Sequence, residues 1–394
     1  MPGTAVTDLA IPPLVDQHCH GIDRRELAAA DFAAYLTESD APPATGTSFF
    51  DTQLGFAVRR WCPPLLGLEA HCTPGHYLER RRELGAAEAA RRLLGATGIA
   101  EYLVDTGIPG DLTCPRELAA AGGGATWHEV VRLEPLAERA ADTADGPGAF
   151  LDALATAVTD AARHAVGFKS VAAYRHGLDL PPDRPRPAQV RTAADQWLLT
   201  RAPGERLTDP VLLRHLLWSA ADTALPLQVH TGFGDPDLTL HRSDPLLLTD
   251  FVRAVRPTGA TVVLLHCYPY HRGAAYLASV FPHVYADMGL ALSHTGARAH
   301  AVLAEMLELT PFGKLLFSTD AYGLPELYVV GAELFRRALS RLLGDWVAEG
   351  AWSAADAGRV AAMVAADNAR RVYRLGSTAS RPHRPQPPRT EPSG

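Results

Sequence analysis

The chain has 394 residues, of which 47% are hydrophobic and 21% are charged, a balance typical of a folded globular protein rather than a disordered one. Its formal net charge of -7 argues against a nucleic-acid partner, because nucleic-acid-binding domains carry a basic surface. There is no apolar run of the roughly 18 residues that a membrane span needs, no N-terminal signal pattern and no disulfide-like spacing among the five cysteines, so we expect a cytoplasmic protein without a membrane partner.

Short apolar runs alternate with longer amphipathic segments along most of the chain. Repeated alternation of strand and helix predicts a parallel sheet, and eight such units favour a (β/α)8 TIM barrel over an open sheet. The segment after the first run, HCHGIDRREL, lacks the glycine-rich fingerprint of an open nucleotide-binding sheet. The eight predicted strands are residues 13–16, 100–104, 129–133, 166–173, 225–229, 261–265, 283–287 and 314–318.

Two segments exceed what a minimal barrel needs. Residues 31–95 separate the first two predicted strands by more than one helix, and we expect them to form a helical cap inserted after strand 1. Residues 324–375 predict extra C-terminal helices, so residues 1–375 are expected to form one barrel domain. Residues 376–394 are rich in proline and polar side chains, which predicts a disordered tail.

Four histidines and one aspartate fall at the ends of predicted strands. In a parallel barrel these ends converge on one face, where functional sites are found. Imidazole and carboxylate are common ligands of zinc, iron and manganese, so the pattern predicts a site for one or two divalent metal ions, with zinc the first choice. The five residues are His18 and His20 in VDQHCHG, His230 in LPLQVHTG, His266 in TVVLLHCY and Asp320 in LLFSTDAYG.

With these motifs the sequence resembles the amidohydrolase superfamily. The stretches GFKSVAAYR and QVHTGFGD are closest to its amidohydrolase-related branch found in nodulin/FluG-like proteins, and the resemblance runs from about residue 13 to 375. That branch can be fused to a glutamine synthetase-like domain; no such domain follows here, so we expect the stand-alone form. The resemblance implies that His18, His20, His230, His266 and Asp320 are metal ligands, and that Asp320 is also the general base on metal-bound water.

Lys169 lies among apolar residues of the fourth predicted strand, where an unpaired charge would be costly to bury. In binuclear amidohydrolases a lysine on strand four is carboxylated and bridges two metal ions, which would make Lys169 a ligand. Alternatively, if the strand runs to Tyr174, Lys169 lies several residues below the barrel mouth and pairs with a carboxylate or acts on substrate. Both interpretations remain open at this point, and the predicted catalytic residues are Asp320, Lys169 and His266.

Polar residues at other strand ends are candidates for substrate binding. Arg132 or Arg175 could hold a substrate carboxylate through a bidentate contact. Cys19 and Cys267 each lie beside a predicted ligand and are expected to point into packing. The complete predicted substrate-binding set is Asp105, Arg132, Glu134, Tyr174, Arg175, Tyr268 and Tyr322.

The leading functional hypothesis is a metal-dependent hydrolase that cleaves a C–N bond, of an amide or γ-glutamyl type, in a small molecule. The bond type follows from family resemblance alone. Two alternatives use the same barrel: a non-heme diiron oxygenase, which histidine- and carboxylate-rich sites can support, and a metal-dependent nonoxidative decarboxylase. The sequence is compatible with a homo-oligomer and does not name the substrate.

Overall fold

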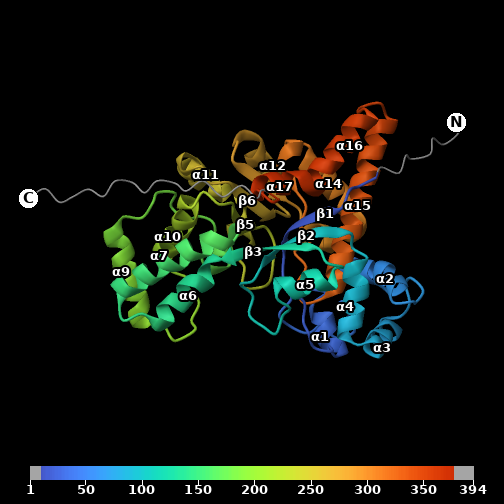
Figure 1. Ribbon diagram of the computed structural model, residues 1–394, viewed down its shortest axis with the longest axis horizontal. Coiled ribbons are helices and arrows are strands. Elements are labelled where there is room, and N and C mark those ends of the chain that lie inside the picture. The colour runs from blue at the N-terminus through green and yellow to red at the C-terminus, as the bar shows by residue number, and fades with distance from the viewer. Residues whose placement is uncertain (1–9, 377–394) are drawn as a thin grey trace, which may run out of the picture.

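A computed structural model describes residues 10–376 as an eight-stranded parallel barrel surrounded by helices (Figure 1). The strands pair in chain order from β1 to β8, and backbone hydrogen bonds from Gln17 to Phe317 (3.1 Å) and from Asp320 to His18 (3.0 Å) join the last strand region to the first. The predicted (β/α)8 TIM barrel is therefore confirmed. The strands are β1 Leu14–Cys19, β2 Ile99–Asp105, β3 Thr126–Arg132, β4 Gly167–Ser170, β5 Leu227–Thr231, β6 Val262–His266, β7 Val284–Asp287 and β8 Leu315–Leu316.

Helices connect the strands. Further helices form the two segments that exceed a minimal barrel, one between β1 and β2 and one after β8. Four helices lie between β1 and β2: α1 Ala29–Ala34, α2 Gln53–Leu65, α3 Pro74–Leu84 and α4 Ala86–Gly95. The barrel helices are α5 Pro115–Ala121, α6 Leu133–Thr143, α7 Pro147–His164, α8 Ala172–Arg175, α9 Pro187–Thr200, α10 Pro210–Asp222, α11 Thr249–Val255, α12 His271–Val280, α13 Ala291–Thr295 and α14 Ala299–Leu307. The C-terminal helices are α15 Pro325–Ala348, α16 Ala354–Ala362 and α17 Asn368–Tyr373.

Residues 377–394, which make up nearly all of the predicted tail, lie outside the described residues. Among the described helices, none combines the length and apolar character required to cross a membrane.

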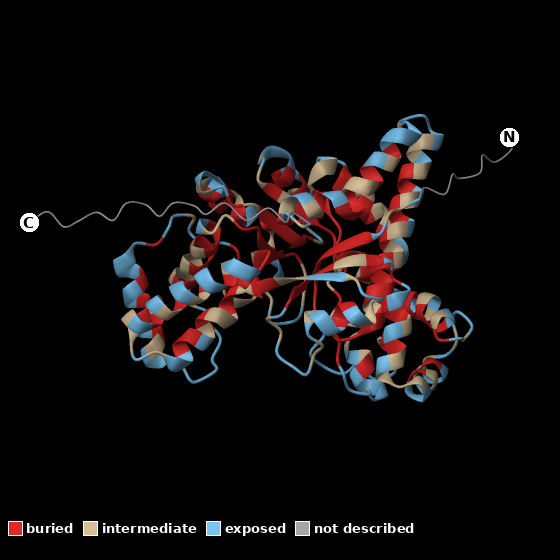
Figure 2. Cartoon of the chain, in the orientation of Figure 1, coloured by how far each residue is buried: buried red, intermediate tan, exposed pale blue. Residues whose placement is uncertain are grey.

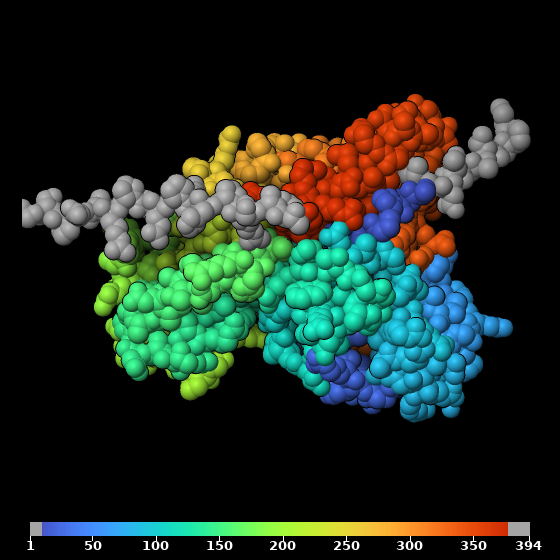
Figure 3. Space-filling model, in the orientation of Figure 1, coloured from blue at the N-terminus to red at the C-terminus, as the bar shows by residue number. Residues whose placement is uncertain are grey.

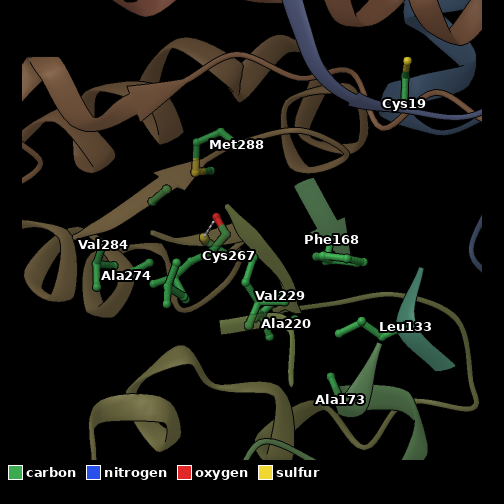
Figure 4. Close-up of a cluster of buried hydrophobic side chains, with 14 of the residues drawn as sticks. Cys19, Leu133, Phe168, Ala173, Ala220, Val229, Cys267, Ala274, Val284 and Met288 are labelled. Atoms are coloured by element: carbon green, nitrogen blue, oxygen red, sulfur yellow. Dashed lines mark hydrogen bonds between the residues drawn. The ribbon is translucent and has the colours of Figure 1, made fainter. Parts of the chain in front are cut away.

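The main hydrophobic core lies between the strands and the surrounding helices. Figure 2 shows buried strands at the centre and exposed residues on the outer faces of the helices. Figure 4 shows part of this layer, where Val229 of β5 lies near Ala220 of α10. Cys19 and Cys267 belong to the same core, which confirms that both thiols are packed away from the predicted ligands.

The C-terminal helices return to the beginning of the barrel. Figure 3 shows the first described residues beside this C-terminal region, and α17 packs against both β1 and β8. From α17, Tyr373 enters the barrel interior, where its hydroxyl donates to Gln17 Oε1 (2.5 Å) and accepts from Gln228 Nε2 (2.8 Å). The last helix thus satisfies two amides inside the barrel, as buried polar groups require.

The fourth strand is shorter than predicted, and the reason is a single carboxylate. The predicted strand covered residues 166–173, but β4 ends at Ser170 and α8 begins at Ala172. Glu134 accepts hydrogen bonds from Ser170 Oγ (2.7 Å) and from the Val171 N–H (2.9 Å), which would otherwise be free to continue the strand ladder. Because β4 stops there, Lys169 lies one residue from the strand's carboxyl end rather than several residues below the mouth.

A buried ion pair fastens the helical cap to the barrel. Arg81 of α3 contacts Glu326 of α15 through Nε and Oε1 (2.9 Å), and the Tyr77 hydroxyl donates to the same oxygen (2.8 Å). Arg81 and Glu326 are 2% and 0% exposed. Figure 1 shows the cap helices gathered beside α15, which continues directly from the loop after β8. Loss of Arg81 would leave the Glu326 carboxylate buried and unpaired, and loss of Glu326 would leave Arg81 only a longer contact with the more exposed Glu26 (3.5 Å).

We expect Glu326→Leu to lower the free energy of unfolding by about 3–5 kcal/mol, because the Arg81 guanidinium would remain buried with only its longer contact to Glu26. Urea denaturation followed by circular dichroism measures the change. Glu83→Gln removes an exposed helical pair with Arg80 and serves as the control, with an expected effect of about 0.5 kcal/mol or less. Equal stability of the two variants would contradict the anchoring role of Glu326.

Candidate metal centre

A cavity of about 570 Å³ opens at the carboxyl ends of the strands. All five predicted metal ligands lie in its wall, so the barrel brings together residues that are up to 302 positions apart in the chain. The donors come from the end of β1, from β5, from β6 and from the loop after β8. They are His18, His20, His230, His266 and Asp320.

The Asp320 carboxylate lies at the centre of this group. Its Oδ1 is 3.1 Å from His18 Nε2 and 3.3 Å from His20 Nε2, and its Oδ2 is 3.6 Å from His266 Nδ1. The rings of His230 and His266 are 4.7 Å apart, which places His230 beside the same group.

A glutamine amide determines the tautomer of His18. Gln228 Nε2 lies 2.7 Å from the backbone oxygen of Gln17, which can only accept, so this end of the amide is the NH2 group. The other end, Oε1, lies 2.9 Å from His18 Nδ1 and accepts from it. His18 Nδ1 therefore carries the proton, and in the neutral ring Nε2 presents a lone pair to the cavity.

A backbone oxygen determines the tautomer of His20 in the same way, and two further imidazole nitrogens lack a hydrogen-bond partner. His20 Nδ1 lies 3.1 Å from the backbone oxygen of Asp105, so it donates and leaves the Nε2 lone pair free. Among the described residues, buried His230 Nε2 and His266 Nδ1 have no hydrogen-bond partner. Nitrogen lone pairs and one carboxylate thus face a common space, an arrangement that a bound cation would satisfy.

Burial keeps the histidines neutral. It lowers the pKa of His18 to about 4, with a further contribution from Lys169, and it lowers the pKa of His230 and His266 well below the ordinary value. Burial alone would raise the pKa of Asp320, but the neighbouring histidine rings, His266 foremost, hold it well below its usual range. The site therefore offers an ionised carboxylate and neutral imidazoles at neutral pH, which is the form that binds metal.

The loop that carries Asp320 is fixed from below by β1. Asp16 accepts hydrogen bonds from the Thr319 N–H (3.0 Å) and hydroxyl (2.5 Å), and the Asp320 N–H donates to the His18 carbonyl (3.0 Å). Asp320 itself has a φ of +52°, in the left-handed region that residues with a Cβ seldom adopt. His266 has a φ of +66°, and its N–H donates to Asp287 Oδ1 (2.7 Å). The surrounding structure thus holds two donors in unusual conformations, as is common at functional sites.

Lys169 lies inside the cavity, next to the donors. Its Nζ is 3.4 Å from His18 Nε2, and the residue is 2% exposed. Burial lowers the pKa of Lys169 to about 8, which increases the fraction of the neutral amine near neutral pH. Both the predicted catalytic lysine and the five predicted ligands are therefore gathered in one wall.

Four of the predicted substrate-binding residues line the cavity: Arg132, Tyr174, Arg175 and Tyr322. The Tyr174 ring lies 4.5 Å from that of His230, and the Tyr322 ring is 6.1 Å from that of His20. Each tyrosine thus lies beside a different donor, while the two arginines come from the end of β3 and from α8, which follows β4.

The other three predicted substrate-binding residues do not line the cavity, and each has a local reason. Asp105 is 1% exposed and holds Arg132 through Oδ2, which lies 2.6 Å from Nη2. Glu134 is 1% exposed and ends β4, as described above. Tyr268 stacks on His271 with ring centroids 5.5 Å apart, in a loop beside the mouth. A strand-end position placed them near the site, but neighbouring groups bind their side chains outside the cavity wall. Asp105 still lies close enough to His18 and His20 that the three could share a metal ion.

Several cavity residues were missed from the sequence because they come from the cap and from irregular loops. Tyr35 and Glu38 follow α1, Leu54 begins α2, and Ser293 and His294 belong to α13. None of these positions is marked by strand-end spacing. The only local signal for Tyr35, Glu38 and Leu54 is that they lie in the segment that exceeds a minimal barrel, and Ser293 and His294 have no such signal.

The role of Gln228 leads to a test by metal binding. Gln228→Met removes the acceptor that fixes the His18 tautomer, so we expect the dissociation constant for Zn²⁺ to rise about 10–100-fold. Competition with a chromophoric chelator measures it on metal-free protein. Tyr373→Phe is the matched control, because it removes a hydroxyl from the same network but leaves the Gln228–His18 bond in place. Equal zinc affinity in both variants would show that Gln228 does not support the site.

Comparison with known proteins agrees with this geometry. The model of the family described as Amidohydrolase matches residues 98–375. The protein fluG of Emericella nidulans is 36% identical over 222 residues, which cover 53% of this chain and 26% of fluG. The chain thus spans about a quarter of the length of that relative.

Solved structures agree as well. A candidate metal-dependent hydrolase from Lactobacillus casei ATCC 334 is 31% identical, with a TM-score of 0.81 over 93% of this chain and 96% of its own. A glucuronate isomerase from Caulobacter crescentus shares the fold at 16% identity, with a TM-score of 0.63 over 93% of this chain and 92% of its own. Together with the family match, the similarity to the Lactobacillus casei protein supports a metal-dependent enzyme.

Proposed function

Because the chain belongs to the amidohydrolase family, we propose that it is a metal-dependent hydrolase that cleaves an amide-type C–N bond in a small molecule. The observation that carries the proposal is the meeting of unpartnered imidazole nitrogens with an ionised carboxylate in a cavity large enough for a metabolite. The metal-dependent character of the similar Lactobacillus casei protein supports the same reaction class.

The donors that would hold the metal are His18, His20, His230, His266 and Asp320, and zinc suits this set of nitrogen and oxygen ligands. When bound, such an ion would polarise a carbonyl group and lower the pKa of a water molecule beside it. We also propose that Lys169, once its amine is carboxylated by CO₂, serves as a further anionic ligand. Its Nζ already lies 3.4 Å from a nitrogen of the proposed ligand His18.

Asp320 is the proposed general base. Its side chain is 13% exposed, so it is accessible from the cavity, and its low pKa keeps it ionised and ready to accept a proton from the attacking water. Oδ1 faces the Nε2 atoms of both His18 and His20, whereas Oδ2 has only the longer contact to His266 (3.6 Å). We therefore assign proton transfer to Oδ2, from which the proton can pass to the leaving amine.

Arg175 is the proposed anchor for a carboxylate on the substrate. Its guanidinium has a single ion pair, with Glu138 at 3.2 Å, and its side chain is only 10% exposed. Nε is buried without a partner, and burial lowers the pKa of Arg175. Arg132 is a weaker candidate because Nε and Nη2 both already donate to Asp105 (2.9 and 2.6 Å). A bidentate carboxylate would satisfy the donors that Arg175 leaves free.

The general-base role predicts that Asp320→Asn loses about 10²–10⁴-fold in turnover number, because an amide can face a metal ion but cannot take a proton from water. Amine release from a panel of γ-glutamyl and other small amides identifies a substrate and gives the rates. Metal content by elemental analysis and substrate binding should change little in the same variant. Near-normal amine release with full metal occupancy would contradict the base assignment.

The anchor role predicts that Arg175→Gln raises KM for a carboxylate-bearing substrate about 10–100-fold with a smaller effect on kcat. Arg175→Lys should rescue little, since a lysine cannot reproduce the bidentate contact. Arg206→Gln is the control at the rim of the cavity, where the side chain is 63% exposed and paired with Asp237. A KM that is unchanged in Arg175→Gln, or raised equally in Arg206→Gln, would rule out a specific carboxylate contact.

A further inference from the structure

A second cavity, of about 750 Å³, lies away from the metal donors between α2, α14 and α15. Arginines from two helices line it: Arg60 of α2, and Arg336, Arg337 and Arg341 of α15. His300 of α14 also lines this basic groove, and Glu333 is the one carboxylate in its wall within the described part of the chain.

Two of the four arginines lack a carboxylate partner. Arg337 lies 3.7 Å from Glu333 and Arg341 lies 3.8 Å from Asp345, both as exposed helical pairs. Within residues 10–376, neither Arg60 nor Arg336 forms an ion pair. A Cβ at Gly98 would come within 2.6 Å of Arg336 Nη2, so the missing side chain at Gly98 leaves room for this guanidinium. Burial lowers the pKa of Arg336, which marks an uncompensated charge held partly out of water.

Trp61 shapes the basic groove. Two guanidiniums contact its indole ring, with Arg60 4.2 Å and Arg337 4.3 Å from the ring centroid. Because these cations already contact the ring, it is not free to stack on a ligand. Recognition in the groove is therefore suited to oxyanions rather than to aromatic rings.

We propose that the basic groove binds a small ligand with a diphosphate-type group. Two of the four guanidiniums, those of Arg60 and Arg336, have no ion pair in the described structure, and the negative charges of two linked phosphates would compensate both. Arginine donors form forked contacts with phosphate oxygens. The cavity volume falls in the range of small-molecule sites.

The basic groove is connected to the metal-centre cavity by shared elements. Helix α2 contributes Leu54 to the metal-centre cavity and Arg60 to the groove, and α15 contributes Leu327 to the former and Arg337 to the latter. Residues 290–300 likewise line both spaces, with His294 on the metal side. A ligand in the groove would contact three elements that also form the metal-centre cavity, so the site is suited to an effector.

Isothermal titration of the full chain with inorganic pyrophosphate tests the proposal. We expect the double variant Arg60→Gln/Arg336→Gln to bind pyrophosphate at least about tenfold more weakly, because two charge-assisted contacts are lost. Arg163→Gln, an exposed arginine on α7 paired with Asp160, controls for overall charge. Arg175→Gln controls for binding of pyrophosphate in the metal-centre cavity. Thermal melting of each variant confirms that it is folded.

Weakening in the groove variant alone supports the site. Weakening only in Arg175→Gln would place pyrophosphate in the metal-centre cavity and overturn the proposal, as would equal binding by all variants. Binding is read without turnover, so this outcome is independent of whether the chain hydrolyses an amide.

Discussion

The functional architecture depends on an electrostatic conflict at Asp320. The Nε2 atoms of His18 and His20 both approach Oδ1, yet each ring already donates its proton through Nδ1 to a protein oxygen. Lone pairs and an anionic oxygen at 3.1–3.3 Å repel one another unless a cation lies among them. Burial lowers the pKa of His18 to about 4, so a proton is a poor source of that charge at neutral pH. A divalent ion resolves the conflict, and the remaining donors surround the same space.

The interior of the barrel keeps this arrangement in place. Gln228 connects His18 to Gln17 and to Tyr373, so a side chain from the last described helix contributes to the tautomer of a residue on the first strand. Asp287 supports His266 through the main chain, by accepting a hydrogen bond from its backbone N–H. These polar groups are buried, and their mutual hydrogen bonds offset the cost of removing them from water. The barrel interior therefore serves as a rigid support for the metal centre.

The cap and α15 extend this support to the substrate side. Helix α15 starts in the loop that carries Asp320, and its Glu326 holds Arg81 of the cap in a buried ion pair. A movement of α15 would therefore displace both the cap residues of the metal-centre cavity and the wall of the basic groove farther along the helix. Such sharing of elements is the structural requirement for communication between two sites, for which differential binding supplies the energy.

The sequence by itself determined the barrel and which predicted metal ligands meet at one end of it, because both follow from local pattern. Strand–helix alternation sets the fold class, and residues at the carboxyl ends of parallel strands must converge wherever the chain closes a barrel. Cys19 could be assigned to packing because neighbouring strand residues face opposite sides. The confirmed fold and the gathering of His18, His230 and Asp320 in one wall rest on these rules.

Only the tertiary structure decided which polar strand-end residues face the cavity. Glu134 and Asp105 occupy positions much like those of the donors, but a neighbouring N–H and a neighbouring guanidinium bind their carboxylates. Lys169 reached the cavity because Glu134 ends β4 early, and the cap supplied Tyr35 through long-range packing. The local sequence pattern determines the face of a strand to which a side chain points. Its hydrogen-bond partner depends on groups that are distant in sequence and meet only in the folded chain.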